Sequence, residues 1–80
     1  MRKIEIKMPF LSPEETAYEL VRWLVPVGAT LEIDQDILEI MVDGAVFRVP
    51  SPLDGVLLSR EAEPGDWLET GRVLAVVAVE

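Results

Sequence analysis

The side chains that most often catalyse reactions or bind metals are scarce in this sequence. It contains no histidine and no cysteine, which removes the commonest general base, the commonest metal ligand and any thiol nucleophile. Four acids lie close together in the chain: Asp34, Asp36, Glu39 and Asp43. Strand geometry sends them to opposite faces, and no glycine-bearing calcium loop accompanies them. We therefore expect neither a catalytic site nor a metal site.

Length and charge exclude further classes of function. Eighty residues allow one domain with a thin core. The 15 acidic and 7 basic residues give a net charge of −8, which repels nucleic acid and anionic lipid and favours basic partners. No apolar run approaches the roughly 18 residues of a membrane span, and the alternating N-terminus does not suggest a signal peptide. We expect a cytoplasmic chain without nucleic-acid or membrane partners.

Short strand-like segments with turn residues between them run through the chain. Residues 3–8 alternate between charged and apolar side chains, which is typical of a half-buried strand. Asp43-Gly44 between two apolar arms favours a type I′ hairpin turn, because glycine adopts positive φ without steric cost. Further strands are expected at residues 30–33, 37–42, 45–49, 56–59, 67–68 and 73–79. Such a set predicts a small closed or nearly closed β-structure.

Residues 13–25 carry conflicting signals. The segment SPEE at 12–15 is typical of a capped helix start, and apolar residues follow it at helical spacing. However, GATLE at 28–32 is similar to GDWLE at 65–69, which is an offset of 37 residues. At this offset residues 18–25 match residues 55–62, whose sequence is unfavourable to a helix. The repeat therefore predicts that residues 18–25 form a strand.

Four segments, in order and at their spacings, resemble one known family. They are IKMPFLSP at 6–13, VRWLVPVGATLEIDQDILEIM at 21–41, VPSPLDGVL at 49–57 and EPGDWLETGRVLAVV at 63–77. The chain resembles a lipoyl (biotinyl/lipoyl-type) domain of the acyltransferase component of a 2-oxo acid dehydrogenase complex. The resemblance implies one all-β domain over 1–80: a flattened barrel, or barrel-sandwich hybrid, of two four-stranded antiparallel sheets. Its pseudo-twofold halves would be roughly 1–44 and 45–80.

In the family the attachment hairpin reads Asp-Lys-Ala, and its lysine carries lipoic acid through an amide. Here the tip reads Asp43-Gly44-Ala45, and the chain's two lysines, Lys3 and Lys7, lie on the first strand. Glycine has no amine with which to form the amide. The resemblance therefore implies lipoate for the family but no cofactor in this chain, whether Gly44 is a natural loss or an engineered one.

The resemblance also implies a partner-contact loop beside the tip. The residues expected to take part are Phe10, Leu11, Ser12, Glu14, Glu15 and Tyr18. Tyr18 stands where the family usually has glycine, so we expect it to add bulk beside this loop. A solvated surface loop is the alternative for residues 10–16, and Glu14 and Glu15 are expected to be solvated or capping acids. Trp23 and Trp67 are expected to pack in the core or at the barrel edge.

Two functions remain open. The first is a lipoyl-domain-like module at the N-terminus of a longer dihydrolipoyllysine-residue acyltransferase. The second is a stand-alone degenerate paralogue that serves as an interaction module, for example for a decarboxylase component, or as a scaffold module. The expected protein partner is a 2-oxo acid decarboxylase component or the parent complex. In neither case is the chain expected to be catalytic by itself. The identity of the 2-oxo acid complex and the oligomeric state are left open.

Overall fold

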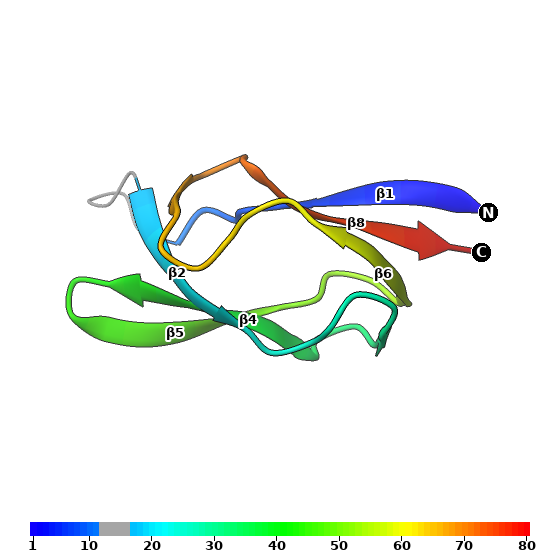
Figure 1. Cartoon of the computed structure of the whole chain (residues 1–80), viewed down its shortest axis with the longest axis horizontal. Helices are drawn as coiled ribbons and strands as arrows, with labels where there is room; N and C mark the ends of the chain where they lie inside the picture. The colour runs from blue at the N-terminus through cyan, green and yellow to red at the C-terminus, as the bar shows by residue number, and fades with distance from the viewer. Residues whose placement is uncertain (12–16) are drawn as a thin grey trace.

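The computed structural model describes residues 1–11 and 17–80, and these residues form eight strands (Figure 1). The strands are β1 (Arg2–Lys7), β2 (Ala17–Trp23), β3 (Thr30–Leu31), β4 (Asp36–Val42), β5 (Ala45–Pro50), β6 (Gly55–Arg60), β7 (Trp67–Glu69) and β8 (Val73–Val79). They build two antiparallel four-stranded sheets, ordered β1-β8-β6-β3 and β5-β4-β2-β7. The predicted fold class is confirmed. Over the described residues no helix is long and apolar enough to cross a membrane.

The helical spacing at the start of β2 results from a bulge in a strand. Tyr18 and Leu20 both point inward and are buried, as alternation requires. The register against β4 then shifts between Leu20 and Arg22, so the chain gains one extra residue at position 21. That extra residue moves the next apolar positions into a spacing that resembles a helix. The repeat-based prediction of a strand over residues 18–25 is confirmed for residues 18–23, whereas Leu24 and Val25 lie beyond the end of β2.

The repeat at an offset of 37 residues reappears in the hydrogen bonds. The backbone N–H of Gly28 donates to the carbonyl oxygen of Leu57 at 2.7 Å, and that of Gly65 donates to Leu20 at 2.8 Å. Each bond therefore joins one half to the other. The two bonds are equivalent, because Gly28 matches Gly65 and Leu20 matches Leu57 at the offset of 37 residues. Both glycines have positive φ, 95° and 94°, a conformation that side chains disfavour. The two halves share one backbone plan.

The third strand is shorter than the sequence predicts. Residues 30–33 were expected to be extended, but β3 ends at Leu31 because the chain turns at residues 32–35, where the N–H of Gln35 donates to the carbonyl oxygen of Glu32 and the φ of Asp34 is 71°. The equivalent turn in the second half contains Gly71, with φ 91°. Aspartate tolerates this left-handed conformation better than most residues do. The first half therefore forms the turn without a glycine, and the sequence did not indicate it.

The inner faces of the two sheets form the core. Its completely or almost completely buried members include Tyr18, Leu20, Leu31, Ile37, Leu38, Ile40, Leu57, Leu68, Leu74 and Val77. Burying each large apolar side chain stabilises the fold by about 1.5–3 kcal/mol. Gly55 on β6 lets the backbones approach, since a Cβ there would meet the carbonyl oxygen of Ala78 and lie 2.5 Å from Cγ1 of Val77.

The two tryptophans have different surroundings. The ring of Trp23 packs against the core, and its Nε1–H donates to the carbonyl oxygen of Ala62 at 2.9 Å. The guanidinium of Arg60 lies 5.7 Å from the centre of the same ring. Packing is therefore confirmed for Trp23. Trp67 lies at the barrel edge, on the edge strand β7, but its side chain is 65% exposed and therefore little packed.

The long axis of the molecule separates the hairpin from the chain ends. The structure measures 37 × 20 × 19 Å along its principal axes. Both termini lie at one end of the long axis, and the β4–β5 hairpin tip lies at the other (Figure 1). This arrangement leaves the tip free of the N- and C-terminal strands.

Candidate functional site

The tip between β4 and β5 is a tight two-residue turn. Val42 and Ala45 form the last register pair, so Asp43 and Gly44 alone connect the strands. Their φ angles are 50° and 81°, and positive φ at both central positions is what a type I′ turn requires. A Cβ built on Gly44 meets nothing within 4 Å. The predicted turn is confirmed, and position 44 faces open space.

The chemistry available at this tip is limited. Asp43, Gly44 and Ala45 are all exposed, and their side chains provide one carboxylate and no amine. The two amines on lysine side chains belong to Lys3 and Lys7 on β1. That strand starts beside the chain ends, away from the hairpin (Figure 1). The tip can present a shape and a negative charge.

The residues expected to contact a partner are placed differently from one another. Phe10 and Leu11 are exposed, at 66% and 46%. Ser12, Glu14 and Glu15 lie outside the described residues. Tyr18 is completely buried opposite Leu68, so its bulk lies in the core and not beside an exposed loop as we expected. Contact with a partner stays a prediction for all of these positions, and Tyr18 can influence it only through the packing beneath the surface.

Sequence reasoning missed a group of exposed apolar side chains around the hairpin. Val46, Phe47 and Trp67 are 50%, 51% and 65% exposed. The registers place Val46 opposite Met41, Met41 opposite Glu19, and Glu19 opposite Trp67. Val46 and Trp67 therefore lie at opposite ends of one row across all four strands of this sheet, and Phe47 lies in the neighbouring row, on the other face. The signal in the sequence is the segment AVFRV at 45–49, which does not alternate between polar and apolar residues as a strand with one solvated face normally does.

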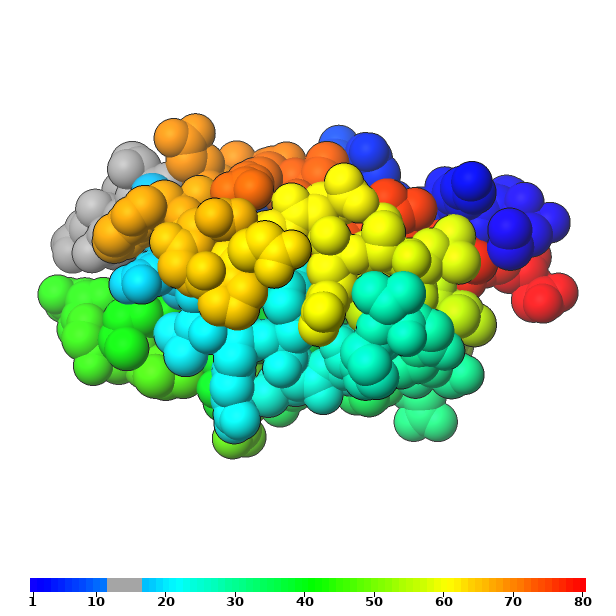
Figure 2. Space-filling view, viewed as in Figure 1, coloured from blue at the N-terminus to red at the C-terminus, as the bar shows by residue number. Residues whose placement is uncertain are grey.

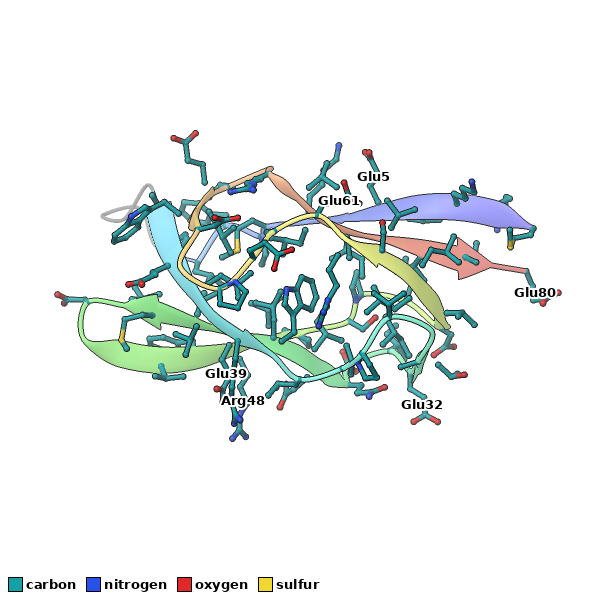
Figure 3. The ribbon with its side chains drawn as sticks, viewed as in Figure 1. Glu5, Glu32, Glu39, Arg48, Glu61 and Glu80 are labelled. Atoms are coloured by element: carbon teal, nitrogen blue, oxygen red, sulfur yellow. The ribbon has the colours of Figure 1, made fainter. Side chains whose placement is uncertain are left out.

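The row next to it is held by an ion-pair ladder. Glu39 on β4 accepts hydrogen bonds from Nε of Arg22 on β2, at 2.6 Å, and from Nε of Arg48 on β5, at 3.3 Å. Figure 3 shows Glu39 and Arg48 side by side on the outer face of the sheet. The hydrogen bond from Arg22, helped by Arg48, lowers the pKa of the Glu39 carboxyl against the opposing effect of its burial. The ladder joins β4 and β5, which carry the tip, to β2 on this face of the sheet.

The architecture and the hairpin can now be set beside known proteins. The family profile described as "Biotin-requiring enzyme", which covers biotin- and lipoyl-carrying domains, matches residues 4–77. The chain belongs to the biotin/lipoyl domain family. The resemblance expected from the four sequence segments is thereby confirmed. Domains of this family carry lipoate or biotin on a lysine.

Curated relatives of this lipoyl-type domain are acyltransferase components. The dihydrolipoyllysine-residue acetyltransferase component of the pyruvate dehydrogenase complex of Corynebacterium glutamicum is 36% identical over 72 residues, which is 90% of this chain and 11% of that protein. The lipoamide acyltransferase component of the branched-chain alpha-keto acid dehydrogenase complex of Pseudomonas putida is 36% identical over 75 residues, which is 94% of this chain and 18% of that protein. The chain thus spans less than a fifth of either relative.

A solved structure agrees with the fold. The lipoyl domain of the 2-oxoglutarate dehydrogenase complex from Azotobacter vinelandii superposes with a TM-score of 0.73 at 25% sequence identity, over 95% of this chain and 96% of that one. Lipoyl domains are carrier modules, so a lipoyl-type chain is not catalytic by itself. The acyltransferase chemistry named for the relatives belongs to those longer proteins.

Proposed function

We propose that this chain is a lipoyl-type module of a 2-oxo acid dehydrogenase acyltransferase component whose hairpin carries neither lipoate nor biotin. The observation that supports the proposal is Gly44 at the tip, where the family pattern Asp-Lys-Ala has its lysine. Formation of the amide requires a primary amine that projects from the turn, and Gly44 has no side chain. Position 44 itself is sterically open, so what the site lacks is the amine and not the space around it.

The remaining lysines do not replace the missing one. Lys3 and Lys7 lie within β1, and the Cα registers pair them with Ala78 and Val73 of β8. A carrier lysine stands on an exposed turn, where a long arm can swing between active sites at high local concentration. A lysine within a paired strand presents its amine from a sheet edge and not from a tight hairpin turn such as Asp43-Gly44.

The partners we propose are proteins of a 2-oxo acid dehydrogenase complex, with the decarboxylase component as the leading candidate. The relatives support this assignment because their names place them in such complexes. The exposed Phe10 and Leu11 support a protein contact on this domain, since apolar side chains in water gain free energy when a partner covers them.

One observation favours a second candidate, a stand-alone paralogue that acts only through protein contacts. Val46 and Phe47 expose apolar surface next to a tip that has no acceptor lysine, and Trp67 exposes more at the opposite edge of the same sheet. Exposed apolar groups of this kind mark interaction surfaces. The reading frame beyond Glu80 distinguishes the two candidates: a linker rich in proline and alanine supports the acyltransferase module, and a stop codon supports the paralogue.

The experiment compares the unaltered chain, Gly44→Lys and Gly44→Ala after incubation with a lipoyl ligase, ATP and lipoic acid. Gly44→Ala is the matched control, because it carries the strain of positive φ without an amine. Intact-mass spectrometry is expected to show a lipoyl group on Gly44→Lys alone. Modification of the unaltered chain contradicts the proposal. A folded Gly44→Lys that stays unmodified shows that residues around the tip, and not only the missing lysine, prevent recognition by the ligase.

A further inference from the structure

The first and fifth strands are equivalent edges of the two sheets. Each has one hydrogen-bonded neighbour among the described residues, β8 for β1 and β4 for β5. Both registers shift at the last residue of the edge strand: between Ile6 and Lys7 in β1, and between Val49 and Pro50 in β5. Their burial patterns are also identical: four exposed residues, one buried and one exposed. The two edges can therefore be compared position by position.

The chemistry of these equivalent positions differs. The exposed positions of β1 hold Arg2, Lys3, Ile4, Glu5 and Lys7, whereas those of β5 hold Ala45, Val46, Phe47, Arg48 and Pro50, so that the only edge-protecting residues of β5 are Arg48 and the terminal Pro50. Charged side chains, lysine above all, keep an edge strand from pairing with other chains. With Lys7 included, β1 has three basic residues and one acidic residue, so two copies of it repel. The β5 edge has a single charge, on Arg48, and Glu39 already pairs with it.

We propose that β5 is a self-association edge, on which the β5 strand of a second copy of this chain pairs antiparallel about a twofold axis at Phe47. In this register Val46 of each copy faces Arg48 of the other. The β5-β4-β2-β7 sheets of the two copies then join into one sheet of eight strands, with the hairpin tips pointing in opposite directions. The proposal does not depend on whether the tip carries a cofactor.

The backbone supports this register. In an antiparallel pair, hydrogen-bonded and non-hydrogen-bonded residue pairs alternate. Counting from the closing pair Val42–Ala45, the backbone groups of Phe47 point to β4, and those of Val46 and Arg48 point away from it. A twofold axis at Phe47 makes Val46 and Arg48 of opposite copies into hydrogen-bonded pairs. Four backbone hydrogen bonds form with groups that β4 does not use.

The side chains support it as well. Phe47 lies opposite Ile40, and Ile40 lies opposite Leu20, so the three form one row on the inner face. Leu20 and Ile40 are buried, but the row ends in Phe47, which is 51% exposed. A second Phe47 across the axis extends this row and covers both rings. Residues in such a non-hydrogen-bonded pair have close side chains, and aromatic pairs there are favourable.

Charge limits the strength of the dimer. Each chain has a net charge of −8, so two copies repel at long range, and added salt screens this repulsion. A single pair of six-residue strands buries less than the roughly 1,000 Å² of a long-lived interface. We expect a reversible dimer that forms at high chain concentration and becomes tighter as ionic strength rises. Figure 2 shows the hairpin segment at the surface of one end of the molecule, where a second copy can reach it.

Cysteine scanning tests the axis directly, because the chain has no cysteine of its own. Under mild oxidation Phe47→Cys is expected to form a disulfide-linked dimer within the Cα separation that disulfides allow, about 4.4–6.8 Å. Val46→Cys, one residue away, and Ile4→Cys, the equivalent position on β1, are the controls. Preferential cross-linking of Phe47→Cys supports the proposal. Equal or weaker cross-linking than in the controls overturns it.

Sedimentation equilibrium of the unaltered chain gives an independent measurement. The apparent mass is expected to rise from monomer toward dimer with concentration, and to rise further with sodium chloride. Val46→Pro is expected to remain monomeric, because it removes an N–H that points away from β4. Phe47→Lys is also expected to remain monomeric, because it places a charge on the edge strand. Circular dichroism confirms that both variants are folded. An unaltered chain that stays monomeric at every concentration and salt overturns the proposal.

Discussion

The Nε–H of Arg22 donates a 2.6 Å hydrogen bond to Oε1 of Glu39 across the β2–β4 pair. The other carboxylate oxygen accepts from Arg48 on β5. Glu39 is nearly buried, while both arginine side chains are about three-fifths exposed, at 62% and 61%. One carboxylate thus links both strands of the hairpin, β4 and β5, to the neighbouring strand β2.

This ladder predicts how stability depends on pH. The pKa of Glu39 is lowered in the folded state, chiefly by the hydrogen bond from Arg22. A lowered folded-state pKa contributes stability that is complete above the unfolded pKa, about 4.3, and is lost as the pH falls through the folded pKa. Glu39→Gln is expected to lower the free energy of unfolding at pH 7, with a difference from the unaltered chain that shrinks toward pH 3.

Urea unfolding at a series of pH values measures this difference. Glu69→Gln, which changes an exposed acid on β7, is the control for the loss of one charge. If the difference between the unaltered chain and Glu39→Gln is the same at pH 3 and pH 7, the ladder does not contribute to stability through this ionisation.

The glycines at the tip and in the sheet are expected to respond differently to an added methyl group. Gly55→Ala pushes a Cβ into the carbonyl oxygen of Ala78 and a methyl of Val77, and such overpacking costs about 1–3 kcal/mol or more. Gly44→Ala meets nothing within 4 Å but keeps φ at 81°, which costs about 1–2 kcal/mol. Thermal unfolding is expected to rank Gly55→Ala as the less stable. The reverse order would show that the neighbouring backbones of β6 and β8 can separate at Gly55.

Tyr18 is expected to matter for stability through its place in the core. It is completely buried, and removing a large buried aromatic side chain costs about 3–5 kcal/mol. Tyr18→Ala should therefore lower the denaturation midpoint strongly. Trp67→Ala is the aromatic control, because its side chain is 65% exposed and surface changes usually stay within about 0.5 kcal/mol. Similar losses for both variants would place Trp67 in a packed contact.

The sequence predicted the fold well because the fold repeats itself. The match between Gly28 and Gly65 carried the inference that residues 18–25 are extended, against a local helix pattern. Each of these glycines donates a hydrogen bond to the other half. Pairing with β4 and β7 decides the conformation of β2 and outweighs its local helical propensity. The bulge after Leu20 lies beyond pattern reasoning, because nothing in the residue types marks an inserted position.

The surroundings of the tip were predicted less completely. The turn at Asp43-Gly44 followed from the glycine alone. The exposure of Trp67 and Phe47 did not, because tryptophan and phenylalanine are usually expected to be buried. Their exposure depends on lying at sheet edges, on β7 and β5, and edge positions emerge only when the strand order is known. Tyr18 was also misplaced. It lies opposite Leu68 on the interior strand β2, and its side chain is buried in the core.

The most direct measurement of the central claim is the intact mass of the unaltered chain recovered from cells that lipoylate and biotinylate their own proteins. Gly44→Lys, produced in the same cells, shows whether those ligases can reach this fold. The proposed empty carrier site predicts the mass of the polypeptide without any lipoyl or biotinyl group. A population of the unaltered chain that bears either group, on Lys3, Lys7 or elsewhere, would contradict it.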